Sequence, residues 1–340
     1  MDSLLPLFLS LFLCAAVGAD LPAKAYWRTI LPHTPMPSVI EQLLQPESYV
    51  EEKGATDVNV GKGGVNVNTG KGTSVNVGHG GVGVNVKPKG KPVIVNVKPK
   101  GSPFSYLYAA ADTQLLDDPS AALFFLREDL RPGKEMTVGF TTTPGLAASF
   151  LPRSTADAIP FSSHGLPLAR TRLGVAPGTE KAEAMQRTVE ECEEPAAEGE
   201  KKLCVTSVEG MVDFATGSLG TRKVVAMATE GGDGVLRTYS VLAARKVASA
   251  GGKGVVSCHA EEYAYAVFLC HGTRTAEVYE VEMAAVDGSA KKVNAVAVCH
   301  VNTGAWNPKY LAFKVLGVKP GTVPVCHFLP RDHVVWAARG

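Results

Sequence analysis

Short runs of β-branched, aromatic and alternating apolar residues fill the last third of the chain and are separated by Gly, Asp and Asn turns. These runs predict strands at 223–229, 235–244, 254–257, 263–269, 276–286, 293–298, 310–315, 323–329 and 333–337. The tetrapeptide Val286-Asp287-Gly288-Ser289 predicts a hairpin between two of them. Short strands joined by such turns indicate an antiparallel sheet that packs on itself or closes up.

One helix is clear ahead of these strands, at residues 179–194. Thr179 can cap it, and Glu180 and Glu183 fall in its first turn, where the helix dipole favours carboxylates. The predicted fold class is therefore mainly β (α+β), a compact antiparallel β-rich domain at 124–338 with one or two helices. His164 lies in an irregular, proline-rich segment and is predicted to be a surface residue.

The N-terminus carries the features of a secretory signal. Residues 4–17 form an apolar run too short for a comfortable membrane span, and Val17-Gly18-Ala19 supplies small residues for cleavage. Asp2 departs from the usual pattern, because Lys or Arg is expected there. We predict a signal peptide at 1–19 and a secreted mature protein that no membrane holds. Residues 20–53 contain several prolines, which disfavour a helix, and are interpreted as a spacer.

A repeat tract follows at 54–102, where the triplet Val-Asn-Val occurs five times with Gly and Lys between the copies. Three-residue strands bury too little apolar surface to become ordered, so the tract is predicted to be a disordered tail. Its lysines suit a weak, salt-sensitive contact with an acidic cell-wall polysaccharide. These lysines are Lys87, Lys89, Lys91, Lys98 and Lys100. An aromatic lead-in strand at 103–123 is expected to dock on the domain.

The dipeptide Cys-His occurs four times within the predicted strands, and Trp336 follows the last copy. The copies are Cys258-His259, Cys270-His271, Cys299-His300 and Cys326-His327. Successive side chains of a strand point to opposite faces, so neighbouring strands would gather thiols on one face and imidazoles on the other. Six cysteines remain after signal cleavage, an even number that favours disulfides in an oxidising compartment. Three pairings of the four strand cysteines remain open, and a mixed Cys-His copper site remains an alternative if a bulge turns one residue.

The four imidazoles indicate a metal site, with structural histidines as the competing interpretation. Neutral imidazole suits copper, zinc and iron, and an all-nitrogen set favours copper. The predicted ligands are His259, His271, His300 and His327. We expect His33, His79 and His333 to be solvated, and Trp336 to be a core or lid residue near the last Cys-His pair.

Several function classes have no support. The sequence contains no G-x-S-x-G, HExxH, P-loop or dinucleotide-binding motif. A net charge of +1 and the absence of a basic patch interleaved with aromatic residues give no basis for nucleic-acid binding. No confident catalytic residue emerges.

The spacing C-H-x10-C-H-x27-C-H-x25-C-H-x8-W resembles the signature of the plant BURP-domain proteins, over roughly residues 104–336. The resemblance implies that the four histidines are copper ligands, because some family members are copper-dependent cyclases that cross-link Tyr or Trp in their own N-terminal region. Cys192 and Cys204 also match the family layout, and we pair them in a disulfide that ties the helix to the strand near Leu203. The valine-rich repeats resemble those of the dehydration-responsive subgroup.

Three functions follow as hypotheses. The first is a non-enzymatic, secreted protein of the apoplast or cell wall, linked by the resemblance to abiotic stress responses. The second is a copper-dependent autocatalytic peptide cyclase; residues 54–101 contain no aromatic residue, so its only substrates would be Tyr26, Trp27, Tyr49 and the aromatic residues of 104–108. The third is an accessory subunit of a pectin-degrading enzyme, although that subgroup has Phe-rich repeats.

Overall fold

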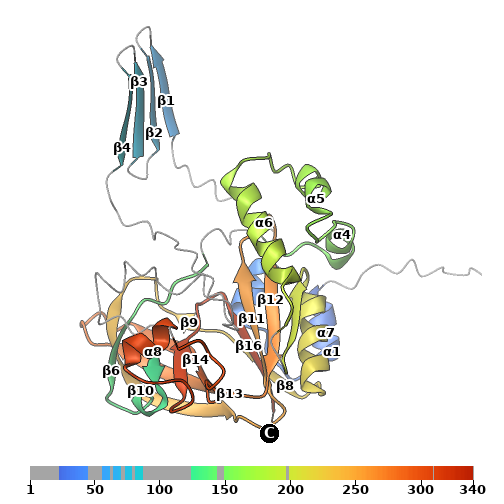
Figure 1. Cartoon of the computed structure of the whole chain (residues 1–340), viewed down its shortest axis with the longest axis vertical. Helices are drawn as coiled ribbons and strands as arrows, with labels where there is room; N and C mark the ends of the chain where they lie inside the picture. Colours follow the sequence, from blue (N-terminus) through green and yellow to red (C-terminus); the bar gives the residue numbers. More distant parts are fainter. Residues whose placement is uncertain are drawn as a thin grey trace, which may run out of the picture.

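Two antiparallel sheets form the domain (Figure 1). The computed structural model describes residues 23–44, 124–143, 149–196, 199–308 and 310–339, together with the backbone of four strands between 56 and 86. The seven-stranded sheet has the order β5 (Phe125–Leu126), β15 (Val325–Phe328), β14 (Lys292–His300), β13 (Ala276–Ala285), β10 (Arg237–Ala248) and β6 (Glu135–Val138), with β9 (Glu230–Gly231) also paired to β14. The five-stranded sheet has the order β7 (Lys201–Val205), β12 (Val267–Thr273), β11 (Val255–Glu261), β16 (Val334–Ala338) and β8 (Val224–Met227).

The inner faces of the two sheets pack on each other. A buried apolar cluster joins Val255 and Val335 of the five-stranded sheet to Val278 and Val298 of the seven-stranded sheet. The alternate residues of β14 point instead into a second apolar cluster, on the outer face of the seven-stranded sheet. These residues are Val293, Ala295, Ala297 and Cys299. Because side chains alternate along a strand, β14 contributes to a core on each of its faces.

The outer face of the five-stranded sheet is covered by helices. α7 (Val208–Leu219) lies against it, with Ser207 capping its N-terminus and Gly220, at φ 63°, ending it. α1 (Ala23–Ile30) lies beside α7, and α2 (Ser38–Leu43) belongs to the same core (Figure 1). The remaining helices are α4 (Arg153–Asp157), α5 (Leu166–Arg172), α6 (Glu180–Glu193), α8 (Leu311–Leu316) and the short 3₁₀ helix η1 (Arg127–Asp129). None of the described helices is long and apolar enough to cross a membrane.

The segment interpreted as a spacer is part of the core over residues 23–44. Trp27 is 2% exposed, its ring centroid lies 5.0 Å from that of Trp336, and its indole N–H donates to the carbonyl of Thr34. The Thr34 hydroxyl in turn donates to the carbonyl of Val224 on β8. The prolines that disfavour a helix stand between α1 and α2, so they end one helix and precede the other.

The fold class predicted from the sequence is confirmed, and most predicted strands lie close to observed ones. The helix at 179–194 is α6, where the Thr179 hydroxyl accepts from the Ala182 amide at 3.2 Å. One assignment was wrong, because 310–315 is the helix α8 and not a strand. Tyr310, Phe313 and Leu316 repeat at the helical spacing of three and pack into one cluster, and Gly317 ends the helix at φ 64°.

The repeat tract pairs with itself in the structure. β1 (Thr56–Gly61), β2 (Gly64–Thr69), β3 (Thr73–Gly78) and β4 (Gly81–Val86) form a four-stranded antiparallel sheet. Between β1 and β2 the register aligns Val58 with Val67 and Asn59 with Asn66, so like residues of successive repeats face each other. The pairing describes only the backbone of four strands within residues 56–86, so the disorder predicted for the tract at 54–102 stays a prediction. The proposed signal peptide, the lead-in strand at 103–123 and the lysines of 87–100 lie outside the described residues.

Candidate functional site

Two Cys-His pairs on neighbouring strands form a repeated unit, once in each sheet. Cys258 on β11 lies directly opposite Cys270 on β12, and Cys299 on β14 lies directly opposite Cys326 on β15. Both pairs are disulfides with a Cα–Cα separation of 4.0 Å. Their sulfurs lie on the outer faces, inside the clusters that cover those faces. A third disulfide joins Cys192 of α6 to Cys204 of β7, as expected.

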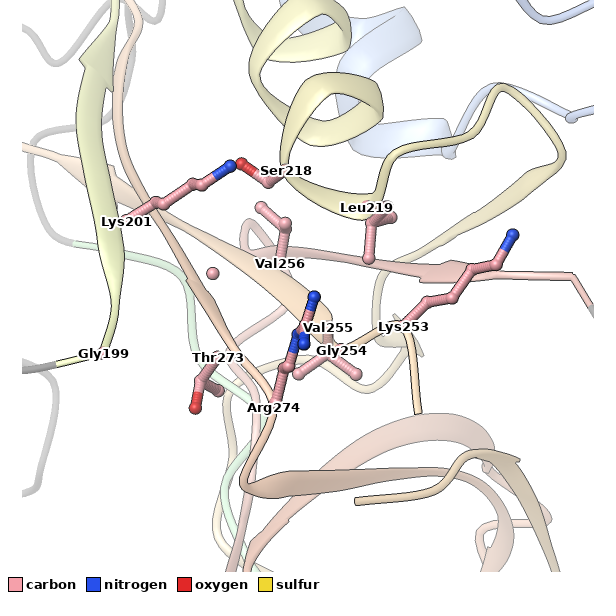
Figure 2. A pocket seen from close by; sticks show the side chains of 11 residues that line it. Gly199, Lys201, Ser218, Leu219, Lys253, Gly254, Val255, Val256, Thr273 and Arg274 are labelled. Atoms are coloured by element: carbon pink, nitrogen blue, oxygen red, sulfur yellow. The ribbon is translucent and has the colours of Figure 1, made fainter. Parts of the chain in front are cut away.

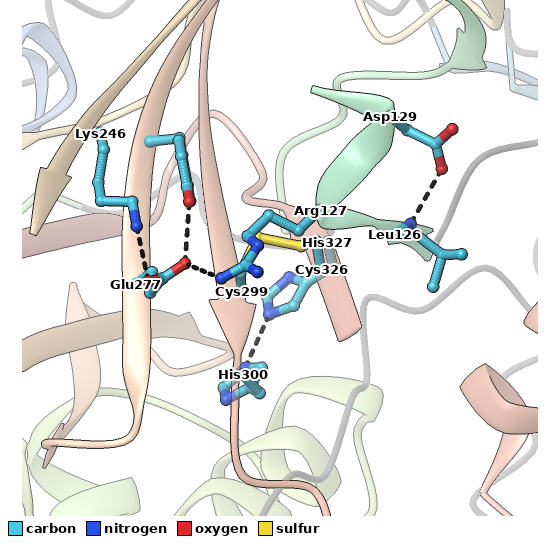
Figure 3. Close-up of a disulfide and its surroundings, with 10 residues drawn as sticks. Leu126, Arg127, Asp129, Lys246, Glu277, Cys299, His300, Cys326 and His327 are labelled. Atoms are coloured by element: carbon cyan, nitrogen blue, oxygen red, sulfur yellow. Dashed lines mark hydrogen bonds and ion pairs between the residues drawn. A yellow bond between two sulfur atoms is a disulfide. The ribbon is translucent and has the colours of Figure 1, made fainter. Parts of the chain in front are cut away.

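The histidines of each unit lie on the inner face, one residue after each cysteine and therefore diagonal to one another. The Nε2 atoms of His259 and His271 are 3.1 Å apart, and those of His300 and His327 are 3.4 Å apart. Figure 3 shows the second pair beside its disulfide. The rings are nearly parallel within each pair, with interplanar angles of 17° and 10°. Alternation along the strands therefore separates sulfur from imidazole, as the sequence predicts.

The two histidine pairs share the space between the sheets. The pKa of His259 is lowered well below its ordinary value, first by burial and then by His333, His271, His327 and His300. Burial likewise lowers the pKa of His300 well below its ordinary value and that of His327 to about 4. These imidazoles are therefore neutral near pH 7, which is the form that binds a metal ion.

Hydrogen bonds at Nδ1 orient His259 and His327, and a carboxylate lies near Nδ1 of His271. His271 Nδ1 lies 3.4 Å from the Glu200 carboxylate, and His327 Nδ1 lies 3.2 Å from the backbone carbonyl of Phe328. His259 Nδ1 lies 2.9 Å from Nδ1 of His333. A partner at Nδ1 fixes the ring and its tautomer, and so directs Nε2 towards the other ring of the pair. His300 instead packs against Trp306, with ring centroids 5.1 Å apart.

The expectation that His333 is solvated was wrong. Its side chain is 1% exposed and lies on the inner face ahead of β16, where it contacts a predicted ligand. Burial lowers its pKa to about 3. His33 and His164 are exposed, as expected, and His79 lies outside the described residues. Trp336 is a core residue, as expected, but it belongs to the cluster around Cys258 and Cys270 and not to the last Cys-His pair.

The separations within the pairs suit an all-nitrogen metal site. Two nitrogens bound to one ion at about 2.0–2.1 Å lie about 2.8–3.4 Å apart for bond angles between a right angle and a tetrahedral one. Both observed Nε2–Nε2 distances fall in this interval. The six cysteines of the described residues are unavailable as ligands because all of them are in disulfides. Within the described part of the chain, however, no group of three or more His, Cys, Asp or Glu side chains converges on one point. The donor chemistry therefore fits two-nitrogen binding by each pair.

A carboxylate network supports the second unit from the outer face. Glu277, which is 7% exposed and pairs with Cys299 across β13 and β14, accepts from Lys246 at 2.7 Å, Tyr279 at 2.8 Å and Arg127 at 3.2 Å (Figure 3). These donors hold the pKa of the carboxyl below its usual value against the opposing effect of burial. Sequence reasoning did not identify Glu277, Glu200 or Asp332, since isolated acidic residues in strands and loops carry no local pattern.

A small cationic pocket lies at one end of the five-stranded sheet (Figure 2). Its volume is about 90 Å³, and Lys201, Lys253 and Arg274 surround a floor that includes Val255 and Val256. Among the described residues, none of these three cations makes an ion pair, whereas Arg237 and Arg245, for example, do. No acidic side chain lines the pocket. The arrangement suits a small anionic group.

Comparisons with known proteins agree with these features. A model of the BURP domain matches residues 123–338. BURP domain-containing protein 3 of Oryza sativa subsp. japonica is 56% identical over 74% of this chain, and the match covers 58% of that relative. BURP domain protein RD22 of Arabidopsis thaliana is 43% identical over 96% of both chains. Protein RAFTIN 1B of Triticum aestivum is 33% identical over 94% of this chain and 91% of its own. The chain thus spans little more than half of the first relative and nearly all of the other two.

Proposed function

This chain belongs to the BURP-domain family, and from that premise we propose that it is an exported, cell-wall-associated protein that binds copper without catalysing a reaction. The similarity to RD22 supports its place in the dehydration-responsive subgroup. On that basis we also propose a role in abiotic stress. Three disulfides are typical of a protein that works in an oxidising compartment, which supports export.

The observation that carries the metal proposal is the pair of facing Nε2 atoms in each unit. His259 and His271 would supply two nitrogens, and His300 and His327 two more. The lowered pKa values of His259, His300 and His327 keep the nitrogen lone pairs of these rings available. The side chains of His271, His300 and His327 are buried, whereas that of His259 is half-buried. Copper, when bound, supplies a redox-active centre. The residues of the chain bind and orient it.

The absence of turnover is proposed because the described aromatic residues of the N-terminal region are occupied elsewhere. Trp27 is buried on the outer face of the five-stranded sheet, opposite to the face that carries His259. The Tyr26 hydroxyl donates to the Asp213 carboxylate. Both residues therefore act as packing and anchoring groups, which does not favour their oxidation.

Copper loading of the exported chain tests this proposal. We expect bound copper, measured by elemental analysis, and an intact mass that shows no loss of two hydrogens. The variant with His259→Ala, His271→Ala, His300→Ala and His327→Ala is expected to retain no copper, whereas a variant with His33→Ala and His164→Ala retains all of it. Equal retention by both variants would refute the site. A two-hydrogen loss mapped to Trp27, Tyr49 or Tyr106 would establish the cyclase instead.

Wall association is proposed through cationic side chains and acidic polysaccharide. The repeat tract supplies Lys87, Lys89, Lys91, Lys98 and Lys100, and the pocket of Figure 2 supplies three further cations. We expect salt-reversible retention of the full chain on immobilised pectate. Replacing the five tract lysines by Gln, or in a separate variant Lys201, Lys253 and Arg274, shows which region is responsible. If neither variant reduces retention on pectate, neither the tract lysines nor the pocket cations bind the polysaccharide.

A further inference from the structure

His333 occupies a place in the site that its sequence context does not reveal. It lies one residue before β16 and shares the inner-face parity of Val335. Its ring meets that of His259 edge-on, with centroids 4.9 Å apart and an interplanar angle of 79°. Its Nδ1 is 2.9 Å from Nδ1 of His259, on the side of that ring that faces away from His271.

The contact between the two Nδ1 atoms permits one proton between them, so one ring donates and the other accepts. The groups around Nε2 of His333 decide which. The Thr143 hydroxyl is 3.4 Å from this nitrogen, and the Asp332 carboxylate is 3.8 Å from it. Asp332 is 2% exposed and is held by the Thr143 amide, which donates to its other oxygen at 2.5 Å. These oxygens favour a proton on Nε2 of His333, which leaves its Nδ1 as the acceptor.

The consequence for His259 follows directly. With His333 as the acceptor, His259 carries its proton on Nδ1, and its Nε2 presents a lone pair towards His271. His327 reaches the same state through the Phe328 carbonyl, and the Glu200 carboxylate lies 3.4 Å from Nδ1 of His271. Two different acceptors, an imidazole and a backbone carbonyl, thus orient His259 in one unit and His327 in the other.

We propose that His333, held by Asp332 and Thr143, is a positioning residue that fixes the tautomer and orientation of His259 for metal binding. This inference rests on the proposed copper function and assigns to it a residue outside the four Cys-His pairs. His333 is not itself a ligand, because its Nδ1 contacts Nδ1 of His259, whereas the metal would bind at Nε2 of His259. Loss of such an outer hydrogen bond lowers metal affinity by about 10–100-fold.

Two substitutions of His333 distinguish the effect of its hydrogen-bond acceptor from the effect of its packing. Asn places its side-chain oxygen near the position of Nδ1 and keeps an acceptor for His259, whereas Phe fills the space without one. We expect Cu(II) affinity, measured by competition with a chelator on the full chain, to fall about 10–100-fold in His333→Phe and to stay within a few-fold of wild type in His333→Asn. Both variants lose the imidazole, so an affinity difference between them reports the hydrogen bond.

The outcomes are distinguishable from those of the parent proposal. If the wild-type chain binds no Cu(II), copper binding itself fails. If it binds and His333→Phe binds equally well, with native disulfides and circular dichroism, the positioning role is overturned. If His333→Phe does not fold, Asp332→Asn decides, with exposed Asp157→Asn as its control: we expect a several-fold loss of affinity in the first and none in the second. Equal affinities in that pair would also overturn the inference.

Discussion

Cys258 and Cys270 face each other across β11 and β12 with their Cα atoms 4.0 Å apart, and the residue after each carries an imidazole on the opposite face. The disulfide therefore fixes the register on which the His259–His271 contact depends, because a slip of either strand by one residue would move the imidazole of that strand to the outer face. The same relationship holds for Cys299 and Cys326. Each disulfide is thus a support for one histidine pair.

Removal of these disulfides should destabilise the domain by predictable amounts. The bridges close separations of 12 residues (258–270) and 27 residues (299–326), for which loop entropy gives about 3 and about 3.5 kcal/mol. We expect losses of this size in the free energy of unfolding for the paired Cys→Ala variants, measured in urea.

The Cys192–Cys204 bridge is a matched control, since its separation is also 12 residues but its cysteines are only half-buried. Its removal should cost no more than that of Cys258–Cys270. A larger loss at Cys192–Cys204 would contradict the view that burial adds to the entropic effect.

Replacement of Trp27 should detach the N-terminal segment from the core. Trp27→Ala removes a fully buried indole from its contact with Trp336, and large-to-small core substitutions of this kind cost about 3–5 kcal/mol. Arg28→Ala, next to it on an exposed position, should change stability by less than about 0.5 kcal/mol. Chemical denaturation followed by tryptophan fluorescence measures both, and equal effects would show that α1 contributes nothing through Trp27.

Acidification should destabilise the metal-free protein. Four histidines have pKa values lowered by burial in the folded state, with His327 at about 4 and His333 at about 3, whereas in the unfolded chain they titrate near 6.5. Below about pH 6.5 the unfolded state binds more protons, so each group removes about 1.4 kcal/mol of stability per pH unit until its folded pKa is reached.

Two buried carboxyls oppose this trend, since burial raises the pKa values of Glu261 and Asp332. They are fewer than the histidines, so the net free energy of unfolding should fall between pH 6.5 and 4.5. Urea unfolding at several pH values measures the slope. A flat or rising stability on acidification would contradict the assignment of neutral, buried imidazoles.

The Glu277 carboxylate should contribute more to the free energy of unfolding than Glu280 on the same strand. Glu277→Gln weakens charge-assisted hydrogen bonds from Lys246, Tyr279 and Arg127, and the expected cost is about 2 kcal/mol. Glu280→Gln, three residues along the same strand, breaks only an exposed pair with Arg245 and should cost at most about 0.5–1 kcal/mol. Thermal unfolding compares the two variants, and a reversed order would show that the network is not stabilising.

Local patterns predicted the chemistry of the Cys-His units because strand alternation is a property of consecutive residues. It needs no knowledge of distant partners to send Cys299 and His300 to opposite faces. The meeting of the two sheets is different, since it depends on contacts between residues far apart in sequence, such as Val255 and Val278. Sequence reasoning therefore found four histidines of the site without showing how they pair.

His333 was missed for the same reason. It has no cysteine beside it, and a lone histidine after an acidic residue resembles a surface residue. The apolar run Val334-Val335-Trp336 that follows it was the available signal, because it indicates that β16 is buried on both faces. The sequence carried a weaker indication that α1 belongs to the core. Trp27 suggested burial, but the prolines after it favoured the interpretation of this segment as a spacer.

The packing of α1 and α2 in the core means that the repeat tract is an internal connection of the domain. Leu44 and Phe124 both pack in apolar clusters of the domain, so the tract between them is joined to one body at both of its ends. Closing a flexible loop becomes only about 0.6 kcal/mol more costly for each doubling of its length. Repeats can therefore be gained or lost with little effect on the stability of the domain, and the number of Val-Asn-Val copies is free to follow the dimensions of whatever the tract spans.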